Sequence, residues 1–149
     1  MFMFLSLFIP TVDRDRWFKL PVNASDDFFI PDNYKGTINF LRVNLEADES
    51  FFTLTSEASW YYFIDKPCPT RFQVVWFAMP LFYQNEVVDD LKSGKVKYII
   101  LRNNHWANKI DGFDNEVRLP VVISYIKQNY IFYKRIDDNE IWIKKSLVS

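Results

Sequence analysis

The sequence contains few of the residues from which common catalytic and ligand sites are built. The glycines are too few and too scattered to form a glycine-rich loop, and they are Gly36, Gly94 and Gly112. This excludes the backbone cradles by which P-loop and Rossmann proteins hold phosphates. One cysteine and one histidine exclude an internal disulfide, a multi-cysteine metal site and paired-histidine ligation. We therefore expect no cofactor and no metal.

The sequence also lacks an excess of charge of either sign. Its 18 Lys and Arg and 19 Asp and Glu residues are interspersed, and the formal net charge is −1. Proteins that bind nucleic acid phosphates usually carry a basic patch or stripe. We therefore expect no nucleic acid partner.

No hydrophobic run is long enough to cross a membrane. The apolar start, MFMFLSLFIP, ends at Pro10 and is followed by charged residues at 13–16. A spanning helix needs about 20 apolar residues, and the start also lacks the basic lead of a signal peptide. Two interpretations stay open: residues 1–10 are a buried N-terminal segment, or they are the last turns of a membrane helix.

Aromatic and other apolar residues are abundant, at 19% and 49% of the chain. A chain of 149 residues with this composition can bury a real core and is too apolar to be disordered. We expect residues 1–33 to form the apolar start and an irregular lead-in, and residues 34–149 to form a single α/β domain.

The hydrophobic spacing predicts helices and strands in alternation. A helix is predicted from Asp32, and another is predicted from a cap at Asn85 to a terminator at Gly94. Pro120 suits the first turn of a further helix. A short aromatic helix is expected at 57–64, and strands are expected at 51–55, 72–77, 96–101, 131–136 and 140–144. The last two strands flank the turn at 137–139 and form a hairpin.

The strand at 96–101 contains the continuous apolar run Tyr98-Ile99-Ile100-Leu101. Such a run is typical of a strand that is covered on both faces in a parallel sheet. We therefore expect this strand at the centre of the sheet. The predicted fold class is α/β, with a layered, mostly parallel sheet, helical crossovers and a C-terminal antiparallel hairpin.

Polar and aromatic side chains directly follow this central strand, and they are Arg102, Asn103, Asn104, His105 and Trp106. Ligands of open α/β sheets bind beyond the carboxyl ends of the strands, where this segment is expected. The arginine suits a phosphate or carboxylate, the amides suit sugar hydroxyls, and the indole suits a sugar face. Two interpretations stay open: a ligand site, or an ordinary wet loop whose tryptophan folds back on the core.

Other candidates for chemistry are weaker. Arg71, after a proline-rich break, is a candidate to hold an anion, and the alternative is an exposed arginine before a strand. His105 has no identifiable nucleophile beside it. Cys68 lies between two prolines and is expected to be a packed small residue. Adjacent carboxylate pairs at 26–27, 89–90 and 137–138 suit a loop, a helix N-terminus and a turn. We predict no catalytic residue.

The order of landmarks from residue 56 onward resembles a known domain class. The landmarks are SWYYFIDKPCPTRF, an acidic helix that leads into KVKYIILRN, then LPVVISYIKQNY and a closing hairpin. They are similar to the soluble C-terminal domain of integral-membrane GT-C glycosyltransferases. This group includes dolichyl-phosphate-mannose protein mannosyltransferase-like and aminoarabinose transferase-like proteins. The resemblance covers about residues 50 to 145.

The resemblance implies a role that the residues alone do not define. Members of this group take a sugar from a polyprenyl phosphate carrier, and their catalytic acidic residue lies in an early extracytoplasmic loop that has no counterpart here. It implies that this chain is an accessory extracytoplasmic domain that packs against the membrane-embedded portion of its parent protein. Residues 1–10 would then be the end of the last membrane helix. The alternative is a free-standing α/β module that binds a small anionic or sugar ligand.

Overall fold

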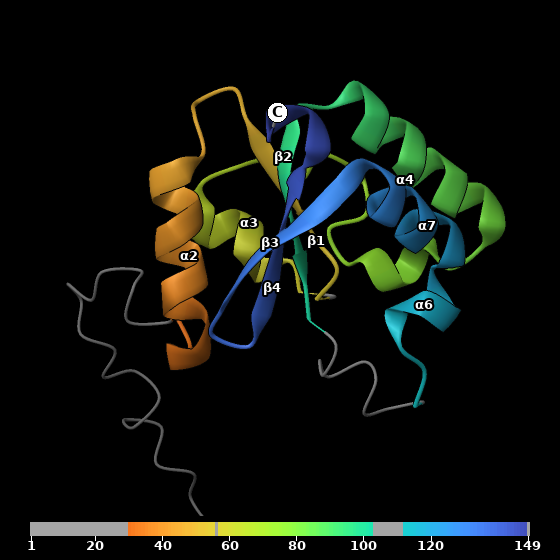
Figure 1. Ribbon diagram of the computed structural model, residues 1–149. Coiled ribbons are helices and arrows are strands. Elements are labelled where there is room, and N and C mark those ends of the chain that lie inside the picture. Colours follow the sequence, from red (N-terminus) through yellow and green to blue (C-terminus); the bar gives the residue numbers. More distant parts are fainter. Residues whose placement is uncertain (1–29, 56, 103–111, 149) are drawn as a thin grey trace, which may run out of the picture.

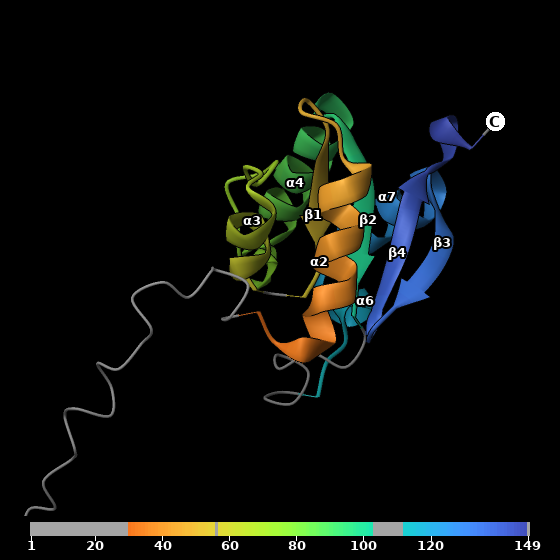
Figure 2. The same ribbon diagram turned by 90° about the vertical axis from the view of Figure 1, so that its left-hand side faces the viewer.

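The computed structural model describes residues 30–55, 57–102 and 112–148, which form a sheet with helices on both faces (Figures 1 and 2). The elements, in chain order, are α2 (Asp32–Asn44), β1 (Ser50–Thr53), α3 (Ser59–Ile64), η2 (Val75–Ala78), α4 (Leu81–Ser93), β2 (Val96–Leu101), α6 (Asn115–Arg118), α7 (Pro120–Asn129), β3 (Tyr130–Ile136), β4 (Asn139–Lys144) and η3 (Lys145–Leu147). No helix in these ranges has the length and apolarity needed to cross a bilayer. The apolar start lies outside them.

The four strands are arranged in the order β1-β2-β4-β3. β1 runs parallel to β2, with Phe52 opposite Ile99. β4 is antiparallel to β2 and also to β3. The sheet is therefore mixed, and the prediction of a mostly parallel sheet is wrong. The reason is that the tight turn after Ile136 reverses the chain, so the closing hairpin inserts β4 beside the central strand.

The core consists of two clusters, one on each face of the sheet. α4 and α7 cover one cluster, and α2 and α3 cover the other, as Figure 1 shows. Successive side chains of a strand point to opposite faces. Ile99 and Leu101 accordingly pack in the first cluster, and Tyr98 and Ile100 pack in the second. β2 is buried on both faces and lies inside the sheet, which confirms the prediction for this strand.

Several other predicted elements are confirmed. α2 begins at Asp32, α7 begins with Pro120 at its first position, and β3 and β4 form the C-terminal hairpin. The aromatic helix α3 and the strand β1 lie where they are expected. The sequence signals were strong here because apolar spacing, proline position and turn residues all agreed.

The predicted strand at 72–77 is wrong. This segment forms turns followed by the 3-10 helix η2. Its buried apolar residues are Phe72, Val75 and Ala78, which are spaced by three, the period of a 3-10 helix. The Thr70 hydroxyl accepts a hydrogen bond from the Phe72 backbone N–H at 3.1 Å, which holds the chain in a turn. The strand prediction relied on an alternation with period two, which the observed burial at every third residue does not follow.

The start of α4 also differs from the prediction. The helix begins at Leu81 after Pro80, four residues before the predicted cap at Asn85. Asn85 instead lies exposed within the helix. Pro80, with an extended ψ of 136°, is the N-cap residue of α4, and no side chain caps the first turn. The predicted end is confirmed, because the Gly94 N–H donates to the Asp90 carbonyl at 2.8 Å.

Candidate functional site at the carboxyl end of the central strand

The predicted ligand site begins at the carboxyl end of β2. Arg102 is the first residue after this strand and is described by the structure. The other predicted residues of this site, Asn103, Asn104, His105 and Trp106, lie outside the described residues. The structure therefore shows the base of this segment and what surrounds it.

Arg102 is held on the face of the sheet that α2 covers. Its Nη2 donates to Asp138 Oδ2 at 2.9 Å, from the turn between β3 and β4. Its guanidinium carbon lies 5.1 Å from the centre of the Tyr34 ring, and the side chain is 12% exposed. Within the described residues, Arg102 Nε is buried without a hydrogen-bond partner. The guanidinium is thus paired with Asp138, and its buried Nε has no partner among the described residues.

Tyr34 connects Arg102 to a second carboxylate. The Tyr34 hydroxyl donates to Glu57, with both carboxylate oxygens 2.6 Å away, and Trp60 Nε1 donates to Glu57 Oε2 at 3.2 Å. The Tyr34 and Trp60 rings stack with centroids 4.7 Å apart. Burial, followed by the bond to Glu57, raises the pKa of Tyr34 well above its ordinary value. Tyr34 therefore stays protonated and joins α2 to the segment before α3.

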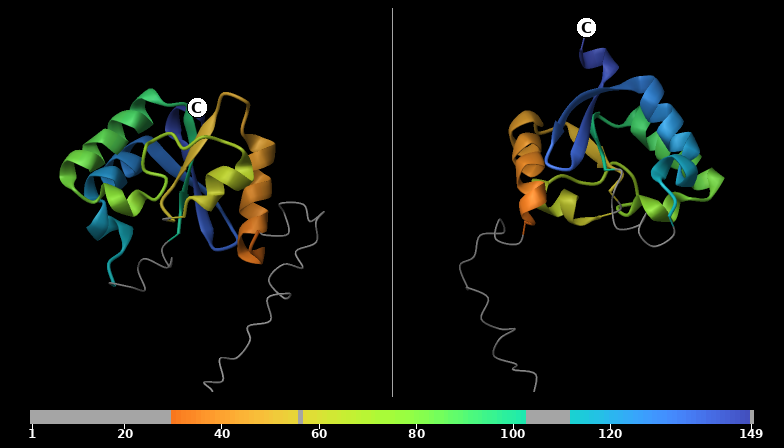
Figure 3. Two further views of the ribbon diagram at one scale, coloured as in Figure 1. Left: turned by 180° about the vertical axis from the view of Figure 1, so that it is seen from behind. Right: turned by 60° about the horizontal axis from the view of Figure 1, so that its bottom comes forward.

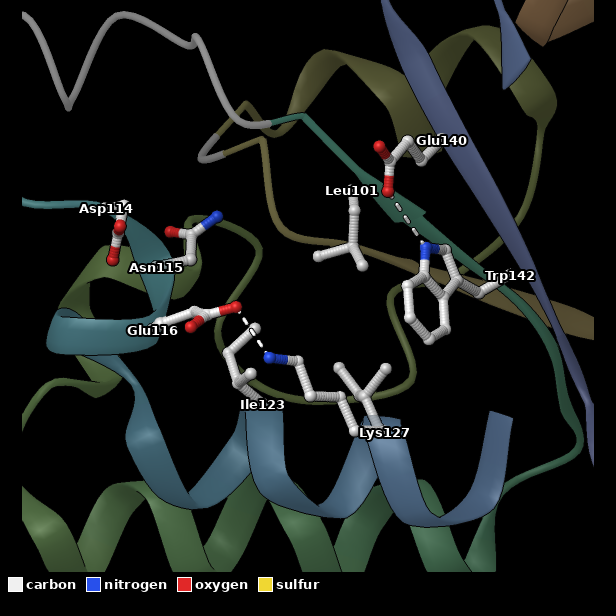
Figure 4. A pocket seen from close by; sticks show the side chains of 9 residues that line it. Leu101, Asp114, Asn115, Glu116, Ile123, Lys127, Glu140 and Trp142 are labelled. Carbon is white, nitrogen blue, oxygen red and sulfur yellow. Dashed lines mark hydrogen bonds and ion pairs between the residues drawn. The ribbon is translucent and has the colours of Figure 1, made fainter. Parts of the chain in front are cut away.

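A small hollow lies on the opposite face of the same strand end (Figure 4). Its volume is about 160 Å³, and its apolar lining comes from Leu101, Ile123 and Ile126. The polar lining comes from Asp114, Asn115, Glu116, Lys127, Glu140 and Trp142. We call this feature the β2 hollow. It is smaller than the ~300–1,000 Å³ typical of sites for drug-sized ligands. It suits one small polar unit.

Each charged group of the β2 hollow already has at least one partner, and Glu140 has two, because its Oε1 also accepts from Arg135 Nη2 at 2.5 Å. Lys127 Nζ donates to Glu116 Oε1 at 2.6 Å, and Trp142 Nε1 donates to Glu140 Oε2 at 3.2 Å (Figure 4). Asp114 Oδ1 accepts from the Val117 backbone N–H at 3.0 Å. A carboxylate accepts several hydrogen bonds, so each acid keeps capacity for a ligand. The three carboxylates of the lining still outnumber Lys127 and the paired Arg135, and this excess of negative charge favours a hydroxyl-bearing ligand over an anion.

Arg71, the other predicted anion-binding residue, lies elsewhere. Its Nε and Nη2 donate to the two carboxylate oxygens of Glu86 at 2.5 and 2.9 Å. Its guanidinium also lies over the Phe72 and Tyr83 rings, 4.6 and 4.7 Å from their centres. The hydrogen bond from Arg71 holds the pKa of Glu86 below its ordinary range. Glu86 thus occupies the position that a bound anion would take, and Arg71 and Arg102 pack against different core clusters.

Cys68 is half-buried beside the α2 and α3 cluster. Its Sγ lies 3.7 Å from Thr70 Oγ1 and 3.8 Å from the Phe72 carbonyl oxygen. These contacts suit a packed residue of the proline-rich loop. In the part of the chain that the structure describes, no group of three or more His, Cys, Asp and Glu residues is placed to hold a metal ion.

The sequence interpretation missed the residues that line the β2 hollow. Glu140 and Trp142 are two residues apart on β4 and share one face, which is visible as an alternation in the sequence. Their meeting with Asp114 and Lys127 depends on how β4 and α7 lie around β2, which no local pattern records. The sequence indicated only that a candidate site would lie beyond the central strand, and that candidate stays a prediction.

The chain has little detectable similarity to known proteins. No protein-family model matches it, and no curated protein matches it. Among solved structures, it is similar to the C-terminal globular domain of oligosaccharyltransferase from Archaeoglobus fulgidus. The sequence identity is 16% and the TM-score is 0.45, over 78% of this chain and 99% of that one. A likeness of this size transfers neither an activity nor a binding residue to this chain.

Proposed function

We propose that this chain is the C-terminal extracytoplasmic domain of a membrane glycosyltransferase-like protein whose donor is a sugar on a polyprenyl phosphate. Its role is to bind and position, and the chemistry belongs to the membrane-embedded portion of the parent protein. The observation that carries the proposal is the β2 hollow, which combines carboxylates, a lysine and an indole at a strand end. The landmark segments KVKYIILRN and LPVVISYIKQNY supply β2 and α7, which line this hollow.

The lining of the β2 hollow supports a sugar as the ligand. Glu140 and Asp114 have acceptor oxygens for hydroxyl groups, and Lys127 supplies a donor. Trp142 offers an aromatic surface against which the C–H face of a sugar ring can pack. The excess of carboxylates opposes a phosphate in the same place. We therefore assign the hollow to a sugar unit of the donor or acceptor, not to the phosphate of the carrier.

The segment that follows Arg102 belongs to the same proposal. Asn103, Asn104, His105 and Trp106 continue the chain from the strand end beside the β2 hollow. Their amides, imidazole and indole add the donors and aromatic surface that a sugar or its lipid-linked carrier requires. Arg102, whose buried Nε has no partner among the described residues, adds a positive charge beside this segment for a phosphate.

The second candidate function is a free-standing α/β module that binds a small anionic or sugar ligand. The observation in its favour is the same buried Nε of Arg102, which an anion could satisfy. Fractionation of the natural gene product separates the two functions. A membrane-embedded product of greater length supports the glycosyltransferase-like domain, and a product found only in the soluble pool supports the free-standing module.

Sugar binding is tested directly by titrating the chain with a panel of neutral monosaccharides and their 1-phosphates. The readout is the indole N–H resonance of Trp142 in the NMR spectrum. We expect at least one neutral sugar to shift this resonance, and Glu140→Gln to weaken the binding of that sugar. Tyr62→Ala, at an exposed aromatic of α3 on the other face of the sheet, is the matched control and should bind as the natural chain does. No shift with any member of the panel would contradict the proposal.

A further inference from the structure

A cluster of apolar side chains, most of them exposed, surrounds the junction between η2 and α4. We call it the apolar tip, and its members are Trp76, Phe77, Met79, Pro80, Leu81 and Phe82. Phe77, Leu81 and Phe82 are 72%, 62% and 64% exposed. Together with Val74, several of these residues also line a shallow and almost wholly apolar hollow. Single exposed apolar residues are ordinary, but a contiguous group marks a surface that contacts something apolar.

The fold holds this tip in place. Val75 and Ala78 are buried beneath it and anchor η2 to the core. Gln84, which is also buried, donates from Nε2 to the Met79 carbonyl at 2.7 Å. Its Oε1 accepts from the Val121 backbone N–H of α7 at 3.1 Å. The apolar side chains are therefore presented outward by a segment that is fixed to α4 and α7.

The apolar tip lies at the same end of the molecule as the start of the described chain. Arg118 of α6 lies over the Trp76 ring at 4.8 Å, and Asn115 of α6 donates to the Leu54 carbonyl beyond β1 at 2.9 Å. Arg102 follows the end of the neighbouring strand β2, and its guanidinium lies over the ring of Tyr34 in the first turn of α2. In Figure 1 the first turn of α2 and the short helix α6 lie at the lower end of the molecule, and the C-terminus lies at the upper end. The right-hand view of Figure 3 brings that lower end forward.

The chain that precedes α2 contains the apolar start MFMFLSLFIP. Residues 11–29 separate this segment from Ile30, and each residue of a chain spans up to about 3.3–3.6 Å. The apolar start and the apolar tip can therefore reach one and the same surface. Tryptophan, phenylalanine, leucine and methionine are the side chains that insert into the interfacial layer of a bilayer.

From these observations we infer that the apolar tip docks on the interfacial layer of a lipid bilayer and so fixes which end of the domain faces the membrane. The members of the tip carry no charge themselves, and Arg71 near it pairs with Glu86. Insertion should therefore depend on apolar burial and respond little to salt. This inference concerns a different surface from the β2 hollow and goes beyond the proposed function.

The test attaches an environment-sensitive NBD dye to one position at a time in the complete chain. Cys68→Ser removes the natural thiol, and Phe77→Cys or Leu81→Cys places a single label on the apolar tip. Val43→Cys is the matched control, because Val43 is 83% exposed but lies in the last turn of α2, away from the first turn. Phosphatidylcholine vesicles are added, with and without lipids that carry a nitroxide quencher on the acyl chain.

We expect the emission of both tip labels to rise several-fold and shift to the blue with vesicles, and the quencher lipids to remove that signal. The control label should stay unchanged. Tip labels that stay unchanged, or a control label that is quenched equally, would overturn the inference. A tip signal that rises with protein concentration and without vesicles would assign the surface to a second copy of the chain and would also overturn it. None of these outcomes bears on sugar binding, so failure here and failure of the proposed function are distinguishable.

Discussion

Gly36 in α2 lies where the C-terminal hairpin touches the helix. A Cβ at this position would lie 2.8 Å from Asp137 Oδ1 and 2.9 Å from Ile136 Cγ2. The Asp137 carboxylate is not free to move away, because its Oδ2 accepts from the Thr37 N–H at 3.0 Å. The glycine in this helix is therefore explained by close approach of the turn and not by backbone conformation.

This contact predicts the sign of a stability change. Ala is preferred to Gly in a helix interior by about 1 kcal/mol, so Gly36→Ala would stabilise α2 if the hairpin were absent. We expect it instead to lower the free energy of unfolding, measured by urea denaturation, because the turn must shift. Asn39→Ala, at an exposed position of the same helix, is the control and should raise stability by a few tenths of a kcal/mol. A higher urea midpoint for Gly36→Ala would contradict the observed contact.

Tyr34 predicts a pH dependence of stability. Its pKa is raised in the folded protein, first by burial and then by Glu57, from an ordinary value of 10.0. The stabilisation is fully present below pH 10 and is lost as the pH rises toward the folded pKa, because only the unfolded state releases the proton. The slope from one such group is at most about 1.4 kcal/mol per pH unit. Between pH 9 and 11, a range set by the ordinary tyrosine pKa, the free energy of unfolding should therefore fall less steeply for Tyr34→Phe than for the natural chain. Equal slopes for both proteins would contradict the account.

The sequence predicted the position of Arg102 at the end of β2 but not the side chains that contact it. Arg102 was expected at the strand end and is there. Its partners, Asp138 and Tyr34, are 36 and 68 positions away in the sequence, counted from residue numbers 102, 138 and 34. Contacts of this separation arise from the packing of the hairpin and α2, which leave no local periodic signal. The same reason explains why Glu86 was not foreseen as the partner of Arg71.

Among the elements, β2 is the one on which both core clusters depend. Ile100 is fully buried in the α2 and α3 cluster. Ile100→Ala should lower the free energy of unfolding by about 2–5 kcal/mol, the usual cost of truncating a buried isoleucine. Ile131→Ala, on the edge strand β3 at a 47% exposed position, is the control and should cost much less. Chemical denaturation of the two variants provides the comparison. A cost below about 1 kcal/mol for Ile100→Ala would place β2 at the periphery of the fold.

Elements with several agreeing signals were predicted well, and elements with one signal were not. β2 and α7 combined apolar pattern, length and boundary residues, and both were predicted correctly. The strand prediction at 72–77 rested on an alternating pattern between flanking prolines, but the observed burial follows the period of three of a 3-10 helix. Sheet order is set by long-range pairing. The insertion of β4 beside β2, which makes the sheet mixed, was therefore not accessible from the sequence.

For the whole molecule, the apolar start should be separable from the fold. Among the described residues, the first buried core residue is Ile30, and the first helix, α2, begins at Asp32. We therefore expect deletion of residues 1–12 to improve solubility and to change the free energy of unfolding by less than about 1–2 kcal/mol. Thermal and urea unfolding of the shortened chain provide the measurement. A loss of more than a few kcal/mol would show that the apolar start is part of the core.

In the function that we propose, this domain binds at the carboxyl end of β2 and does not catalyse. Steady-state kinetics of the complete membrane protein with Trp142→Ala test it most directly. Loss of an interaction made equally with substrate and transition state raises KM and leaves kcat nearly unchanged, and this is the result that the account predicts. Arg102→Ala and Trp106→Ala should behave in the same way if the segment after β2 contributes. A large fall in kcat at saturating substrate, with KM unchanged, would contradict the account, because it would place the β2 hollow in the catalytic machinery.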